Sequence, residues 1–265
     1  MITVYQPVGK NTGAAIIVFP GGGYTILAID LEGTEVCDRF TSKGITCVLL
    51  KYRVPGLEFY LKPAYPKSGP YPESPIALED AQRALSLVRF HAVEWGINPH
   101  KIGVLGFSAG GHLVAATSTQ FDKRVYPVVD AVDKESCRPD FAVSIYPGHL
   151  SLEAAEWDAK RGNGKYPIPY EENPIITNKR FGINPDLHIT SGIPPTFLLQ
   201  AEDDHIDDVG DSIAYYIALE KVGVPVEMHL YAQGGHAFGL RQTEFPITNW
   251  PELVEKWLIT IGMVK

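Results

Sequence analysis

Short runs of almost uninterrupted apolar residues recur along this chain, and segments with helical periodicity lie between them. Such runs are typical of strands that are buried on both faces of a parallel sheet. They occupy residues 14–19, 45–50, 102–105, 141–146 and 196–199. Residues 226–231 alternate between apolar and polar side chains, which indicates a strand nearer the sheet edge. The alternation of strands and helices with short connections predicts an α/β fold with an open, mostly parallel sheet and helices on both faces.

The clearest helix is expected after the serine-proline pair at 74–75, which is a typical helix start. Apolar residues then recur at spacings of three and four over 78–95, and Gly96 follows as a stop. Similar stripes lie over 209–216 and 249–261, the second opening with capping-box spacing. We expect these helices to pack against the two faces of the sheet and so to bury its apolar side chains.

Composition excludes several classes of protein. The chain has 265 residues, 45% of them hydrophobic, and a formal net charge of −8. At this length one large α/β domain or two small domains are possible, and either can bury a large core. Neither a nucleic-acid partner nor a membrane partner is expected, since no basic stripe or polybasic run occurs. An uncharged stretch over 11–29 is broken by Pro20 and three glycines, and the N-terminus has no signal-peptide pattern. Oligomeric state and compartment, cytoplasmic or secreted, stay open.

Three cysteines are too few for a disulfide framework. Cys37, Cys47 and Cys137 are expected to be small buried apolar residues. A bridge between Cys37 and Cys47 is the alternative.

A nucleophile is predicted where the apolar run 102–105 leads into Gly106-Phe-Ser-Ala-Gly110. Gly-x-Ser-x-Gly between a buried strand and a helix is typical of a strained turn that presents a reactive serine. Glycines at 106 and 110 let neighbouring backbone approach the turn, and the helix start places free N–H groups beside it. We expect Ser108 to be the nucleophile; the alternative is a tight turn with an idle serine.

Backbone donors for an oxyanion are predicted after the run 14–19, which ends in a glycine triplet at 21–23. Amides without side chains nearby can converge on the negative oxygen that forms when a serine attacks an ester. The expected donors are the amides of Gly22, Gly23 and Ala109. A phosphate loop lacks its required spacing, and a plain turn is the remaining alternative.

Several carboxylates follow the run 196–199, and the candidates among them are Glu202, Asp203, Asp204 and Asp207. Asp203 is the expected orienting acid because it falls at the carboxyl end of the strand, where functional groups gather in open α/β sheets. Asp204 is the alternative. The cluster lacks the spacing of a metal-binding loop, so no metal site is expected.

The expected base is His236, in a glycine-containing loop beyond 226–231. A serine needs such a base, and the base needs an orienting carboxylate. The order Ser108, Asp203, His236 is that of the α/β-hydrolase triad. The competing histidines are His112, His149, His205 and His229.

The sequence resembles the α/β-hydrolase superfamily and, within it, the acetyl-xylan esterase and feruloyl-esterase-like bacterial carbohydrate esterases. The resemblance spans nearly the whole chain and is carried by 20–24 (PGGGY), 50–53 (LKYR), 80–84 (DAQRA), 106–112 (GFSAGGH), 138–140 (RPD), 146–147 (YP), 201–204 (AEDD) and 234–239 (GGHAFG). In that family the acid precedes a hydrophobic residue by three positions, and Asp203 with Ile206 fits this pattern. Two features depart from the family: Pro20 stands where lipases have histidine, and 149–191 is longer than the usual connection.

The resemblance implies a single domain of α/β-hydrolase fold over 1–265 and a serine carboxylesterase that needs no cofactor. Its implied substrates are small-molecule or oligosaccharide esters, such as acetylated xylan or xylo-oligosaccharides. Tyr24, His149 and Trp157 are candidate substrate-binding residues, and 148–193 is a candidate lid or surface insertion. The alternatives are an amide or formamide hydrolase resembling kynurenine formamidase, and a non-catalytic binding protein of the same fold.

Overall fold

A computed structural model describes residues 1–54, 74–152 and 181–265 of the chain. Seven strands form one sheet in the order β1-β3-β2-β4-β5-β6-β7. All neighbouring pairs are parallel except β1 with β3. The strands are β1 (Ile2–Tyr5), β2 (Ala15–Phe19), β3 (Thr46–Leu50), β4 (Ile102–Phe107), β5 (Ala142–Ile145), β6 (Thr196–Ala201) and β7 (Val226–Tyr231). The predicted α/β architecture is confirmed, and β1 adds an edge strand that the sequence analysis did not predict.

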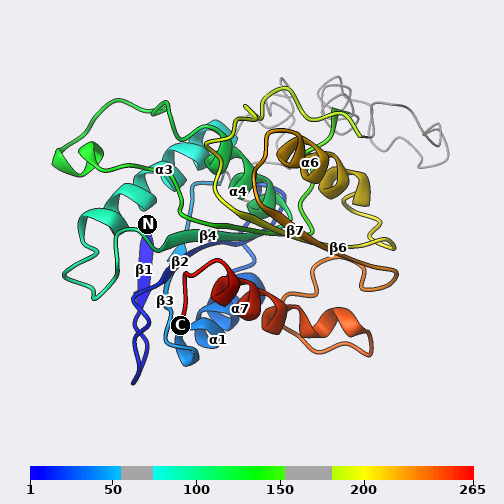
Figure 1. The fold of residues 1–265 in the computed structure, drawn as a ribbon, viewed down its shortest axis with the longest axis horizontal. Coiled ribbons are helices and arrows are strands. Elements are labelled where there is room, and N and C mark those ends of the chain that lie inside the picture. Colours follow the sequence, from blue (N-terminus) through cyan, green and yellow to red (C-terminus); the bar gives the residue numbers. More distant parts are fainter. Residues whose placement is uncertain (55–73, 153–180) are drawn as a thin grey trace.

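Helices cover both faces of the sheet (Figure 1). On one side lie α3 (Ser74–Phe90), α4 (Ala109–Thr119) and α6 (Val209–Lys221). On the other side lie α1 (Glu35–Ser42) and α7 (Trp250–Thr260). Short helical turns occupy Asp30–Thr34, Ala131–Lys134 and Pro246–Asn249.

Two helix ends differ from the sequence prediction. The apolar stripe extends to residue 95, but α3 ends at Phe90 and the chain continues in turns to Gly96, whose φ is +67°. The predicted capping box at Asn249 is not formed, because α7 continues directly from the preceding helical turn and the Asn249 side chain makes no capping bond.

The core has two layers, one on each face of the sheet. Every residue of β2, β4, β5 and β6 is buried, whereas β7 is partly exposed along its length. This matches the predicted difference between continuous apolar runs and the alternating run, since β7 lies at the sheet edge.

Cys37 and Cys47 form a disulfide that joins α1 to β3, with their Cα atoms 5.2 Å apart. The expectation of small buried thiols is therefore wrong for these two residues, and the alternative pairing is the observed one. Both side chains belong to the core layer between α1 and the sheet, which brings them together. Cys137 is a buried free cysteine, as expected.

The candidate lid or surface insertion over 148–193 falls largely outside the described residues. Trp157 lies in 153–180, so its predicted contact with substrate stays a prediction, as does a lid over 148–193. The described ends of that region meet in a single bridge between Ser151 and Ile183. Within the part of the chain that the structure describes, no helix has the length and apolar character needed to cross a membrane.

Candidate active site

Ser108 occupies a sharp turn between β4 and α4. Its φ of +53° lies in the left-handed region, which is strained for a residue other than glycine. The turn is held by a hydrogen bond from the Ser108 amide to the Ile145 carbonyl, at 3.0 Å. A side chain on Gly106 or Gly110 would collide with backbone, of residue 110 in the first case and of Phe19 in the second. The Gly-x-Ser-x-Gly spacing is therefore a packing requirement of this turn.

His236 lies beside the serine and joins it to a carboxylate. Its Nε2 is 3.0 Å from Ser108 Oγ, and its Nδ1 is 2.7 Å from Asp204 Oδ2. The Asp204 side chain is fully buried. If Nδ1–H donates to Asp204, Nε2 is left as the acceptor for the serine hydroxyl proton. Three elements far apart in sequence thus form one hydrogen-bonded chain.

The expected pairing of His236 with Asp203 is wrong. Asp203 Oδ1 accepts hydrogen bonds from the amides of Gly234 and Gly235, at 2.9 and 2.7 Å. Asp203 therefore fixes the backbone of the loop that carries His236. The Asp204 side chain points toward His236 instead. Its Oδ1 accepts hydrogen bonds from the amides of Ile206 and Asp207, which hold the turn after β6 in place.

Charges around His236 favour its protonated form. Burial alone lowers the pKa of the imidazole, but the hydrogen bond to Asp204 and the negative charges of Asp207, Asp204 and Glu32 outweigh that effect. The pKa of His236 is therefore raised above its ordinary value. An imidazole that gains basicity in this way is suited to accept a proton from a hydroxyl.

The glycine loop after β2 lies against the nucleophile turn. A Cβ on Gly21 would stand 2.9 Å from the Cβ of Ser108. The backbone of Gly22 and Gly23 has φ of +128° and +60°, conformations that favour glycine. Within the described ranges, no protein acceptor is found for the amides of Gly22, Gly23 and Ala109. Their role as oxyanion donors stays a prediction.

Glu32 is a buried carboxylate of this site that the sequence analysis missed. It is 2% exposed, and it accepts the Gly21 amide at 2.6 Å and the Tyr146 hydroxyl at 2.8 Å. Burial raises its pKa, while these two hydrogen bonds oppose that effect. A glutamate near a helix start looks like an ordinary surface residue, so nothing in the sequence distinguishes it.

The predicted substrate contact of Tyr24 is not supported. Its ring is fully buried, and its hydroxyl is 2.7 Å from His112 Nδ1. Tyr24 and His112 are therefore packed together inside the protein, and the rings of His112 and His149 also meet edge to face.

The carboxylate of Asp207 lies close to the hydroxyl of Ser108. Its Oδ2 lies 3.4 Å from Ser108 Oγ and 3.8 Å from His236 Nε2. Its Oδ1 lies 3.7 Å from His149 Nε2, and contact of His149 with substrate stays a prediction. Asp207, and no hydrophobic residue, stands three positions after Asp204. Ile206 is 71% exposed, so its fit to the family pattern was misleading.

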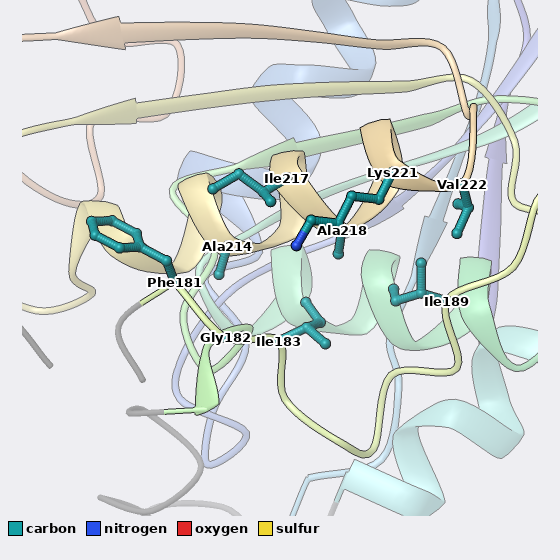
Figure 2. A pocket seen from close by; sticks show the side chains of 9 residues that line it. All are labelled: Phe181, Gly182, Ile183, Ile189, Ala214, Ile217, Ala218, Lys221 and Val222. Carbon is teal, nitrogen blue, oxygen red and sulfur yellow. The ribbon is translucent and has the colours of Figure 1, made fainter. Parts of the chain in front are cut away.

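Two further observations concern possible binding sites in the rest of the described residues. Among residues 1–54, 74–152 and 181–265, no three His, Cys, Asp or Glu side chains are grouped as metal ligands. An apolar hollow of about 280 Å³ lies between α6 and the segment after residue 180 (Figure 2). It is lined by Phe181, Gly182, Ile183, Ile189, Ala214, Ile217, Ala218, Lys221 and Val222, none of which belongs to the hydrogen-bonded chain around Ser108.

Comparison with known proteins places this geometry in context. Residues 16–240 match a protein family described by the alpha/beta hydrolase fold. The chain is 29% identical to an acetylxylan esterase of Xylanibacter ruminicola, covering 86% of this chain and 42% of that protein. It is 26% identical to an arylesterase of Saccharolobus solfataricus, covering 89% and 72% of the two chains. The chain thus spans less than half the length of the acetylxylan esterase.

Solved structures resemble the chain over its whole length, and one of them is more than 30% identical. It is an acetyl ester-xyloside bifunctional hydrolase from Caldicellulosiruptor lactoaceticus, 36% identical, with a TM-score of 0.76. The match covers all of this chain and 89% of that one.

Proposed function

The chain belongs to the alpha/beta hydrolase fold family, and from this we propose that it is a serine carboxylesterase that removes small acyl groups from sugar esters. One observation carries the proposal: Ser108, His236 and Asp204 are joined by hydrogen bonds of 3.0 and 2.7 Å. A hydroxyl, an imidazole and a buried carboxylate in this order form the machinery of acyl transfer through a covalent intermediate.

In the first step, His236 Nε2 removes the proton from Ser108 Oγ as that oxygen bonds to the ester carbonyl carbon. The carbonyl oxygen becomes negative, and the amides of Gly22, Gly23 and Ala109 stabilise it. His236 then gives its proton to the departing alcohol oxygen as the ester bond breaks, which leaves an acyl group on Ser108.

In the second step, water attacks the acyl-enzyme while His236 accepts a proton from the water. The bond to Ser108 Oγ breaks, the proton returns to that oxygen, and the carboxylic acid is released. Asp204 stabilises the imidazolium in both steps and holds the ring with Nε2 toward the serine.

The names of the similar proteins support sugar esters as substrates. An acetylxylan esterase and an acetyl ester-xyloside hydrolase both match most of this chain. We therefore propose acetylated xylan or xylo-oligosaccharides as the substrate class.

The test is hydrolysis by wild-type protein and by Ser108→Ala. Wild-type protein should release acetate from phenyl acetate and from acetylated xylo-oligosaccharides, and a fluorophosphonate should label Ser108. Ser108→Ala should lower kcat by roughly 10⁴–10⁶-fold. Unchanged hydrolysis by this variant would refute the assignment, and failure of the wild-type protein to react with the label would favour a non-catalytic binding protein.

Substrate class needs its own comparison. N-formylkynurenine tests the formamide alternative, and separate measurement of acetate and xylose release distinguishes cleavage of the ester from cleavage of a glycosidic bond. We expect acetate release to be the fastest of these reactions, and faster turnover of N-formylkynurenine would overturn the ester proposal.

A further inference from the structure

We propose that Asp207, with His149 beside it, binds a free hydroxyl next to the reacting ester and so selects esters of polyhydroxylated alcohols. The inference rests on the proposed function and adds the residues that recognise the alcohol. Neither residue takes part in the proton transfers described above.

The position of Asp207 carries the inference. Its Oδ2 lies 3.4 Å from Ser108 Oγ, the atom that bonds to the ester carbonyl carbon. An ester that bonds to Ser108 Oγ therefore brings atoms close to this carboxylate. The other oxygen, Oδ1, lies 3.7 Å from His149 Nε2. A carboxylate and an imidazole thus lie next to each other near the nucleophile.

Hydrogen bonds of the Asp207 backbone hold this residue in place. The Asp207 amide donates to Asp204 Oδ1 at 3.1 Å, and its carbonyl accepts from Gln200 Nε2 at 2.7 Å. A side chain at Gly148 would collide with the Asp207 carboxylate, so the glycine provides the room that this group occupies.

The His149 backbone is fixed in the same manner. Its amide donates to Asp211 Oδ2 at 3.2 Å, and its carbonyl accepts from Asn184 Nδ2 at 2.9 Å. Its φ of +63° is unusual for a residue other than glycine and is maintained by these bonds. The backbones of both residues are thus fixed, which limits the conformational entropy that is lost when their side chains bind a ligand.

The chemistry of the pair identifies the ligand group. An ionised carboxylate only accepts hydrogen bonds, whereas an imidazole can donate or accept. A hydroxyl can donate to Asp207 and interact with His149 at once. In a partly acetylated sugar, such a hydroxyl stands on the ring carbon next to the ester. An acyl chain or a simple alkyl alcohol offers no donor there, and an anionic substituent is repelled by the Asp207 charge.

The test compares three acetates of one ring: trans-2-hydroxycyclohexyl acetate, its 2-methoxy analogue and cyclohexyl acetate. Wild-type protein should prefer the hydroxy ester in kcat/KM by about ten- to hundredfold, the size of effect of a hydrogen bond to a charged group. Asp207→Val should abolish most of this preference, and Asp207→Asn, which keeps one acceptor oxygen, should reduce it partly. Glu202→Gln, which removes an equal charge from an exposed neighbouring position, should leave the preference unchanged.

Failure of the inference and failure of the proposed function are distinguishable. Equal kcat/KM for the three acetates in wild-type protein overturns the hydroxyl-binding role, whether or not Asp207→Val folds. The same holds if the preference survives in Asp207→Val. Absence of hydrolysis of every acetate, together with no fluorophosphonate labelling of wild-type Ser108, overturns the proposed function itself.

Discussion

The Glu32 carboxylate accepts a hydrogen bond of 2.8 Å from the Tyr146 hydroxyl inside the protein, 114 residues away in sequence. Its second oxygen accepts the Gly21 amide at the start of the glycine loop, and the Tyr146 hydroxyl in turn accepts the Gly239 amide. Glu32 and Tyr146 therefore connect the proposed oxyanion loop to the loop that carries His236. The rings of Tyr146 and His236 also lie 4.9 Å apart.

Glu32→Gln is expected to lower kcat with little change in KM. Gly21 and Tyr146 donate to different oxygens of the Glu32 carboxylate, and glutamine has an NH₂ donor in one of these two places, so one of the two hydrogen bonds is lost. A buried partner left unsatisfied costs about 1–3 kcal/mol, which corresponds to roughly 5- to 150-fold in rate if the loss falls on the transition state. Steady-state kinetics with phenyl acetate measure both constants.

Glu35→Gln is the matched control, because Glu35 lies a few residues away and pairs at the surface with Arg241. We expect near wild-type kcat for this variant. An equal loss in both variants, or a rise in KM without a fall in kcat for Glu32→Gln, would contradict a positioning role for Glu32.

The two neighbouring aspartates should differ sharply when each is replaced by asparagine. Asp204→Asn removes the partner of His236 Nδ1 and favours the wrong tautomer, so kcat should fall by roughly 10³–10⁴-fold. Asp203→Asn keeps an acceptor oxygen for the amides of Gly234 and Gly235, so kcat should fall by less than about tenfold. Burst kinetics with an aryl ester separate acylation from release of the acid in both variants.

Thermal unfolding of each variant is the control for structural damage. The assignment of Asp204 fails if Asp203→Asn is the more damaged enzyme while both variants keep a wild-type Tm.

The pH profile of kcat/KM should report the charges around His236. The base acts in its neutral form, and its pKa is raised by Asp204, Asp207 and Glu32 despite burial, so the acidic limb should lie above the ordinary histidine value. Asp207→Asn removes one negative charge and should move this limb to lower pH. A limb that stays in place, or moves to higher pH, would contradict this electrostatic role.

Fold and site differ in how far the sequence predicts them. Strands β2 and β4 are buried on both faces, and strands buried in this way have continuous apolar runs in the sequence. Ser108 and His236 were predictable because glycine-rich turns mark them, and each turn follows a strand whose position was clear. The edge strand β1 was missed because its four residues are only partly buried and it pairs antiparallel at the sheet edge.

The choice between Asp203 and Asp204 depends on a single turn after β6. Both residues sit at the carboxyl end of the same strand, and only the hydrogen bonds of the folded turn decide which one faces His236. The role of Glu32 likewise depends on a contact with Tyr146, which is too distant in sequence for any local sequence pattern to predict it. The roles of Asp204 and Glu32 therefore depend on contacts between polar residues that are distant in sequence, and the sequence alone does not predict such contacts.

The disulfide between Cys37 and Cys47 should contribute measurably to stability, since it closes a loop between residues 10 positions apart. In the chain-entropy model a loop of this size contributes about 2–3 kcal/mol. That corresponds to a fall in Tm of roughly 5–10 °C for a protein of this size when both cysteines are replaced by alanine. Differential scanning calorimetry with and without reductant checks this: reductant should lower the Tm of the wild-type protein and leave that of the double variant unchanged. Equal sensitivity of both proteins to reductant would show that the bridge does not stabilise the fold.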